Sequence, residues 1–247
     1  MSIFTQAFRP KARSTTGGPN FLGRTPDTFT RPVPMSEHQR RLLFMICSLL
    51  LDYPHDGASH TWRLVEEQSG ALADTASEKI TAFLKTATSQ GERSMQEQYV
   101  ETFDQRRKCS MFLSYYSVGD TRQRGTAILA FKHQLEALGL ESAREELPDH
   151  LCVVLEAAAK ADTTERHSTA TEVLAAHRDG LEVLRTALEN LDSPYAHLIT
   201  AVCMALPDVD QETVDSYINL IRSGPPAELV GLGTPLPFSG THAETSF

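Results

Sequence analysis

The chain has 247 residues, of which 40% are hydrophobic and 22% are charged. This balance excludes a chain that is disordered along its whole length, because such chains combine low hydrophobicity with high net charge. The formal net charge is -9, and an acidic body repels a phosphate backbone, so the folded part is better suited to a basic peptide than to nucleic acid.

The two ends differ in composition from the rest. Residues 1–34 are rich in Gly, Pro, Thr and Arg and show no hydrophobic periodicity, so we predict a disordered basic leader. The charged residues of this leader are Arg9, Lys11, Arg13, Arg24, Arg31 and the single acid Asp27. We predict an all-helical domain over residues 35–230 and a mobile Gly/Pro/Thr tail over 231–247.

Two helices are predicted early in the domain. Ser36 and Gln39 have capping-box spacing ahead of an apolar repeat that ends at Tyr53-Pro54. Thr75 and Glu78 offer a second capping box, followed by one apolar face and then by Gly91 as a breaker. That predicted face contains Ile80, Phe83, Leu84 and Ala87.

Three more helices are predicted in the middle of the chain. Tyr99 and Phe103 lie one turn apart on the first. Asp120 and Gln123 are predicted to cap the second, which Gly139 ends. Pro148 suits the first position of the third, which places Asp149 in its first turn. The expected core stripes are Ile128, Phe131, Leu135 and Leu138 on the second helix, and Leu151, Val154, Leu155 and Ala158 on the third.

The last helices follow the same periodicity. One seam with alternating spacings of three and four predicts a long bundle helix. Its positions are Leu174, His177, Leu181, Leu184, Leu188 and Leu191. Ser193-Pro194 opens a further helix with Leu198, Ala201, Val202 and Ala205 inward, and Asp210 starts the last, which carries Val214. The fold class is therefore all-α, a single-domain helical bundle.

The four cysteines show no metal-site or disulfide pattern. They are separated by more than 40 residues each and form no Cys-x-x-Cys pair. The longest apolar run, Leu42 to Leu51, is half of the roughly 20 residues that cross a bilayer. The leader has no apolar segment before a cleavage site. We expect a cytoplasmic protein without a metal or a cofactor of its own.

The segment Glu146-Leu147-Pro148-Asp149-His150 has two interpretations. Capping explains an acidic residue at a helix start, because the helix dipole favours it. The alternative is a hinge loop that presents a carboxylate beside a neutral imidazole to a polar or cationic group. A catalytic Asp149/His150 pair is disfavoured, since adjacent helical residues point about 100° apart and no nucleophile motif accompanies them.

Aromatic residues gather between positions 99 and 116. Core packing is the simpler interpretation of Phe103 and Phe112. Tyr99, Tyr115 and Tyr116 are also suited to line a groove, with rings against an apolar peptide and hydroxyls at the rim. His177 is predicted to be a core histidine with a satisfied hydrogen bond, because no Glu-x-x-His partners accompany it.

These residues, in this order, resemble the NarJ-type nitrate reductase molybdenum cofactor assembly chaperones, also called nitrate reductase delta subunits. The resemblance covers about Glu37 to Leu232. It is carried by Leu51-Asp52-Tyr53-Pro54, Tyr99-Val100-Glu101-Thr102-Phe103-Asp104, Gly119-Asp120-Thr121-Arg122 and Glu146-Leu147-Pro148-Asp149-His150-Leu151. The last motif is similar to the E-x-P-D-H hinge of the wider family of TorD and DmsD redox-enzyme maturation chaperones.

The resemblance implies a non-enzymatic cytoplasmic chaperone. Its partner would be the N-terminal peptide of the nitrate reductase catalytic subunit, held while the molybdenum cofactor is inserted and before the complex docks at the membrane. The implied peptide-binding residues are Glu146, Pro148, Asp149, His150, Tyr99, Phe103 and Asp104, to which the groove interpretation adds Tyr115 and Tyr116. Two other classes stay open: a helical hydrolase or nucleotide-using enzyme centred on Asp149/His150, and a regulator that binds nucleic acid through the leader.

Overall fold

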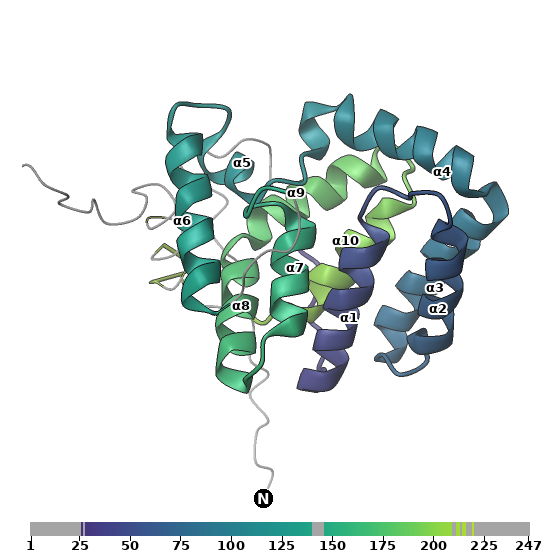
Figure 1. Ribbon diagram of the computed structural model, residues 1–247, viewed down its shortest axis with the longest axis horizontal. Helices are drawn as coiled ribbons and strands as arrows, with labels where there is room; N and C mark the ends of the chain where they lie inside the picture. The colour runs from purple at the N-terminus through teal and green to yellow at the C-terminus, as the bar shows by residue number, and fades with distance from the viewer. Residues whose placement is uncertain are drawn as a thin grey trace, which may run out of the picture.

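The computed structural model describes residues 26, 28–139, 146–208, 211–212, 214–215 and 219. Within them the chain forms ten α-helices and no strand, which confirms the all-α fold class. The elements are α1 (Glu37–Leu50), α2 (Ala58–Ser69), α3 (Asp74–Gln90), α4 (Glu92–Tyr99), the π-helix η1 (Val100–Asp104), the 3-10 helix η2 (Arg107–Cys109), α5 (Leu113–Val118), α6 (Gln123–Ala137), α7 (Leu151–Lys160), α8 (Thr164–Ala176), α9 (Arg178–Glu189) and α10 (Tyr195–Ala205). In Figure 1, α1 lies between α2–α4 on one side and α6–α8 on the other.

Helix α1 begins where the sequence predicts because its capping box forms. The Gln39 amide donates to the Ser36 hydroxyl at 3.2 Å, and the Ser36 amide donates to the Gln39 side-chain oxygen at 3.1 Å. Each bond satisfies an amide that has no partner inside the helix. The helix ends at Leu50, with Leu51 as its C-cap, just before the predicted stop at Tyr53-Pro54.

Helices α1 and α7 run antiparallel and form the centre of the bundle. Near one end of the pair the Ser48 hydroxyl donates to the Cys152 carbonyl at 2.9 Å, and near the other the Arg41 guanidinium donates to the Ala159 carbonyl at 3.3 Å. The side chains that they contribute to the core are fully buried: Phe44, Cys47, Leu151 and Leu155. Burial of each large apolar side chain is worth roughly 1.5–3 kcal/mol.

Helices α2 and α3 pack together beside α1. Helix α2 was not predicted, and it starts at a left-handed Gly57 without a side-chain cap of its own. Helix α3 starts after Ala73, so Thr75 lies inside the first turn and the predicted capping box is wrong. The predicted apolar face is confirmed as buried, and Gly91 ends the helix with a φ of 81°.

Helix α6 has the predicted span but not the predicted start. Its N-cap is Arg122, and no side chain caps it, so the prediction of an Asp120 cap is wrong. Phe131, Leu135 and Leu138 of the expected stripe are buried, whereas Ile128 is only partly buried. The helix stops before Gly139, whose φ of 70° is left-handed.

The long seam predicted from Leu174 to Leu191 belongs to two helices. Helix α8 ends and α9 begins at His177, whose φ of -95° and ψ of 12° interrupt the repeat. Leu191 lies beyond α9 and is 36% exposed. His177 is the core histidine predicted: its Nδ1 lies 2.8 Å from the Val173 carbonyl, and burial lowers its pKa to about 4.

Residues 28–34, which the sequence places in the leader, lie against α9 and α10. The Thr30 amide donates to the buried Glu182 carboxylate at 2.7 Å, and the Val33 amide donates to the Met204 carbonyl at 2.8 Å. The buried Arg178 guanidinium donates to the Thr30 carbonyl. Most of the predicted leader, the whole predicted tail and most of the helix predicted from Asp210 lie outside the described residues.

The remaining features concern cysteines, metals and membranes. Cys47, Cys109, Cys152 and Cys203 are free and buried. Among the described residues, no three His, Cys, Asp or Glu side chains gather as a metal site would require. In the same part of the chain, every helix is too short or too polar to span a membrane.

Helix α10 has the predicted buried face but starts one residue later than predicted. It begins after Pro194, and its predicted inward residues are all buried: Leu198, Ala201, Val202 and Ala205.

Candidate peptide-binding site

The predicted hinge pairs with the chain segment that precedes α5. The Leu113 amide donates to the Asp149 carbonyl at 2.9 Å, and the Leu151 amide donates to the Met111 carbonyl at 2.8 Å. Phe112 lies between these two bonds, as an antiparallel bridge partner of the hinge. The hinge is therefore attached by its backbone to residues 38 positions earlier in the chain.

This pairing shifts the start of α7. His150 is the N-cap, with an extended backbone at φ -68° and ψ 133°, and the helix begins at Leu151. The prediction that Pro148 is the first helical residue and that Asp149 lies in the first turn is wrong. The backbone hydrogen bonds to the segment before α5 hold His150 extended, which overrides the local preference for a proline at a helix start.

Asp149 is fully buried, which is unusual for a carboxylate. Its Oδ2 accepts a hydrogen bond of 2.5 Å from the Ser114 hydroxyl, while its Oδ1 has no partner among the described residues. Burial raises the pKa of Asp149, and the Ser114 bond and the Arg124 charge oppose that rise. The carboxyl thus joins the hinge to α5 and faces the core, so it does not present a charge to solvent.

The other hinge residues differ in exposure. Glu146 is exposed, Pro148 is partly buried and His150 is 7% exposed. The His150 and Phe112 rings meet edge to face with centroids 5.2 Å apart, and the Arg124 guanidinium lies 4.8 Å from the centre of the Phe112 ring. A guanidinium at this distance is within range of a cation–π contact. The start of α6 is therefore linked to the hinge.

Tyr99 and Phe103 belong to an aromatic cluster in the core. Their ring centroids lie 4.8 Å apart, and Tyr195 of α10 lies 5.9 Å from Tyr99 and 5.0 Å from Phe103. Tyr53 meets Tyr99 edge to face at 5.5 Å. Burial raises the pKa of the Tyr99 phenol far above its usual value, so the ring stays neutral. Such pairs stabilise by about 0.5–1.5 kcal/mol beyond the area they bury.

The remaining predicted site residues are separate from this cluster. Tyr116 is buried and its hydroxyl donates to the Ser110 carbonyl at 2.8 Å, so the hydroxyl points inward and not to a rim. Tyr115 is partly buried beside it, with ring centroids 5.6 Å apart. Asp104 is exposed at the end of η1.

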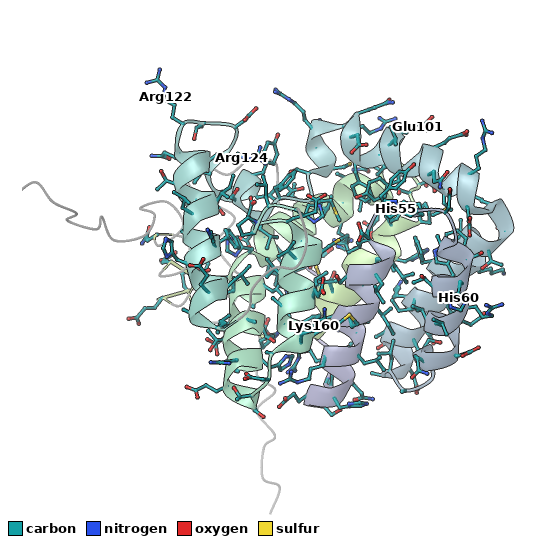
Figure 2. The ribbon with its side chains drawn as sticks, in the orientation of Figure 1. His55, His60, Glu101, Arg122, Arg124 and Lys160 are labelled. Atoms are coloured by element: carbon teal, nitrogen blue, oxygen red, sulfur yellow. The ribbon has the colours of Figure 1, made fainter. Side chains whose placement is uncertain are left out.

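Several of the motifs meet at one end of the bundle. The hydrogen bond from Ser48 to Cys152 brings the end of α1, and with it the loop over residues 51–56, next to the start of α7. The charge of Asp52 also acts on Tyr99. Figure 2 shows His55 of this loop and Glu101 of η1 on the same side of the molecule, with Arg122 and Arg124 on the opposite side.

An open groove of about 690 Å³ lies between this loop and the α4–η1 segment. Its lining is Tyr53, Asp56, Glu92, Arg93, Gln96, Glu97, Val100, Glu101 and Gln105. The Gln96 amide group holds the loop to α4 by donating to the Pro54 carbonyl at 2.9 Å. With four carboxylates and one guanidinium along it, the groove favours a positively charged occupant.

Glu92 has a structural role within this groove. Its carboxylate accepts hydrogen bonds from the Gly57 amide at 3.1 Å and the Ser59 amide at 2.7 Å, at the start of α2. The Ser59 contacts lower its pKa, with a smaller contribution from Gly57. An acceptor from another helix therefore caps α2, which explains why the residues around position 57 give no start signal.

A smaller, mostly apolar pocket of about 190 Å³ lies on the other side of the same loop. It shares Tyr53 and Asp56 with the groove, and its apolar lining includes Leu50, Trp62, Phe83 and Tyr195. Leu49 at its edge is 42% exposed. The large apolar side chains of this surface lie mainly in the pocket, whose lining also includes Asp52 and His55, and most of the carboxylates lie along the groove.

Sequence reasoning identified only part of this surface. The lining residues Trp62 and Tyr195 were not predicted, because they are far from the aromatic cluster in sequence. The useful signal was the Leu51-Asp52-Tyr53-Pro54 motif, which was used only for the resemblance. Tyr99 and Phe103 lie beneath the surface, since Tyr99 contacts Tyr53 and both rings contact Tyr195.

Comparison with known proteins finds one matching family and several relatives. A family described as "Nitrate reductase delta subunit" matches residues 67–201. The chain is 30% identical over 188 residues to a probable nitrate reductase molybdenum cofactor assembly chaperone NarJ of Bacillus subtilis, covering 74% of this chain and 99% of that protein. It is 33% identical over 181 residues to NarJ of Escherichia coli, covering 70% and 74%.

A third relative is a longer protein. The chain is 34% identical over 176 residues to the nitrate reductase-like protein NarX of Mycobacterium tuberculosis. The match covers 69% of this chain but only 25% of NarX. The matching segment therefore makes up about a quarter of NarX.

Proposed function

The chain belongs to the nitrate reductase delta subunit family of NarJ-type assembly chaperones, and on this premise we propose that it binds the N-terminal region of the nitrate reductase catalytic subunit. It is a molybdenum cofactor assembly chaperone and not an enzyme. In the proposed sequence of events, the chaperone holds the cytoplasmic apoenzyme while the molybdenum cofactor is inserted, and releases it for docking at the membrane.

The observation that carries the proposal is the pairing of an acidic groove with an apolar pocket around Tyr53. An amphipathic peptide with an apolar face and basic residues matches both halves: its apolar side chains enter the pocket and its cations meet the carboxylates. Apolar burial supplies affinity, and the charges supply orientation and a faster encounter. The hinge and the start of α7 support the same end of the bundle, because Asp149 accepts from Ser114 and Cys152 accepts from Ser48.

In this proposal, the hinge residues contribute in different ways, according to whether they are buried or exposed. Asp149 is buried against Ser114, so its proposed contribution is to hold the hinge and α5 together. Glu146 is exposed and is the hinge residue placed to meet a cation of the client directly. Tyr99 and Phe103 support the floor of the surface from below, and Asp104 lies exposed at the end of η1.

Isothermal titration of the full chain with a synthetic N-terminal peptide of the catalytic subunit tests the proposal. The groove variant is Glu97→Gln/Glu101→Gln, and the matched control is Glu78→Gln/Glu165→Gln, two exposed glutamates on α3 and α8 that do not line either cavity. Loss of two contacts of up to about 1 kcal/mol each weakens binding roughly fivefold to thirtyfold in the groove variant. Equal affinities for both variants would contradict the site, and no binding to the folded natural chain would contradict the function.

The enzyme alternative at Asp149/His150 has no supporting observation. The one hydroxyl bonded to the Asp149 carboxylate is that of Ser114, and both residues are fully buried. A nucleophile needs a base and a route for substrate. Membership of a chaperone family also favours a binding role over turnover.

A further inference from the structure

We propose that residues 3–13 of this chain occupy the acidic groove and the apolar pocket when no client is bound, so that the leader competes with the client peptide. The inference rests on the proposed function, because it concerns the same surface. It adds a regulatory element within the chain itself, which is displaced when the client arrives.

Charge complementarity is the first support. The groove is lined by Asp56, Glu92, Glu97 and Glu101, with Arg93 as its one basic residue. The Glu101 carboxylate has no ion pair among the described residues, and Arg106 at this edge donates to the Glu101 backbone carbonyl and not to the carboxylate. The leader carries Arg9, Lys11 and Arg13 within five positions, and its single acid comes later, at Asp27.

The order of residue types is the second support. Ile3, Phe4 and Phe8 immediately precede Arg9 in the sequence. The surface has the same arrangement, since the apolar pocket and the acidic groove adjoin at Tyr53 and Asp56. A segment with its apolar residues at one end and its cations at the other thus fills both cavities without a reversal of direction.

The length of the leader allows this placement. Val33 is bonded to Met204 near the end of α10, and Tyr195 near the start of the same helix lines the apolar pocket. Nine helical residues separate these two positions, which corresponds to about 14 Å along the helix axis. The 15 residues from Arg13 to Thr28 span up to about 50 Å when extended, so the tether is several times longer than this separation.

Because the leader is tethered to the domain, even weak binding of the leader to the groove and pocket gives high occupancy. A short flexible linker gives an effective concentration in the millimolar range. If the free leader peptide bound with a Kd of about 0.1 mM, the tethered leader would occupy the surface in about ten molecules for each one in which the surface is free. Client affinity would then fall about tenfold. A modest affinity of the leader is therefore enough to reduce client binding measurably.

The test compares two full-length variants with the same change in net charge. The leader variant is Arg9→Glu/Arg13→Glu. The control is Lys85→Glu/Arg122→Glu, two exposed cations outside both cavities. The chain has a single tryptophan, and Trp62 lines the apolar pocket, so acrylamide quenching of its fluorescence reports pocket occupancy without any client. Titration with the client peptide gives the second readout, and circular dichroism verifies folding.

The proposal requires stronger Trp62 quenching and roughly tenfold tighter client binding in the leader variant, with the control unchanged in both. Unchanged quenching together with unchanged client affinity in the leader variant would overturn it while leaving the proposed function intact. If no variant binds the client peptide, the proposed function fails, and the Trp62 readout still decides whether the leader occupies the pocket.

Discussion

The Ser114 hydroxyl donates a hydrogen bond of 2.5 Å to Oδ2 of Asp149, and both residues are fully buried. This bond joins α5 to the hinge from within the core. Because Asp149 also accepts a backbone bond from Leu113, the hinge is attached to α5 by side chain and backbone together. The family motif at the hinge therefore has a structural role that its sequence alone does not reveal.

Replacement of Asp149 distinguishes its charge from its hydrogen bond. Asp149→Asn keeps an acceptor for Ser114 and removes a buried charge, whereas Asp149→Ala leaves the Ser114 hydroxyl without its partner and costs about 1–3 kcal/mol. Urea unfolding at pH 7 should rank the Asn variant at or above the natural chain and the Ala variant well below it. Equal losses in both variants would contradict this prediction, because they would mean that a neutral acceptor for Ser114 cannot replace the carboxylate.

The same pair predicts a dependence on pH. Burial raises the folded-state pKa of Asp149 above its unfolded value of about 3.9. Its contribution to stability is therefore fully present below that value and is lost as the pH rises through the folded-state pKa. The free energy of unfolding of the natural chain, relative to Asp149→Asn, should fall between pH 4 and neutrality. A constant difference would contradict the raised pKa.

Replacement of Gly180 by alanine is predicted to destabilise the fold. An added Cβ would lie 2.8 Å from both Cβ and Cγ of Tyr116, atoms close to the backbone that cannot swing away. Gly180→Ala should destabilise the chain by about 1–3 kcal/mol. Gly125→Ala is the matched control in a helix, because nothing lies within 4 Å of its added Cβ, and it should be neutral or stabilising by up to about 1 kcal/mol.

His177 should make the fold sensitive to acid. Its buried ring has a pKa of about 4, compared with about 6.5 when unfolded. Its stabilising contribution is present above pH 6.5 and is lost as the pH falls through 4, by an amount on the order of 3 kcal/mol. His177→Phe should reduce the slope of unfolding free energy against pH in this window. An unchanged slope would mean that other groups control acid unfolding.

Glu182 should hold the segment over residues 28–33 in place. Its fully buried carboxylate accepts from the Thr30 amide and from Arg185 at 2.6 Å. Glu182→Ala should therefore increase hydrogen exchange at the Thr30 amide by at least about tenfold, since a bond to a charged group contributes about 1.5–3 kcal/mol. Glu189→Ala, at an exposed residue that also pairs with Arg185, is the control and should leave this amide protected.

Local signals predicted local structure well. The Ser36/Gln39 capping box and the buried faces of α3, α7 and α10 appear as expected, because caps and apolar periodicity act within a few turns. Features that depend on distant residues were missed. Glu92 caps α2 from another helix, and the bridge between Phe112 and His150 delays the start of α7.

The candidate site shows the same contrast between local signals, which were informative, and contacts between distant residues, which were missed. The motif around Tyr53 and the segment around Glu101 both contribute to the groove. Trp62 and Tyr195 were not predicted, because only the tertiary fold brings them to the pocket. Tyr116 was predicted for a groove wall, yet its ring packs on Gly180, a contact that neither residue signals in sequence.

The measurement that tests the central claim most directly is the molybdenum content of nitrate reductase purified from cells that lack this chain. We predict reductase with little cofactor, restored to full content by the natural chain and by Glu78→Gln/Glu165→Gln but only partly by Glu97→Gln/Glu101→Gln. Reductase that carries its full molybdenum content in the absence of this chain would contradict the account.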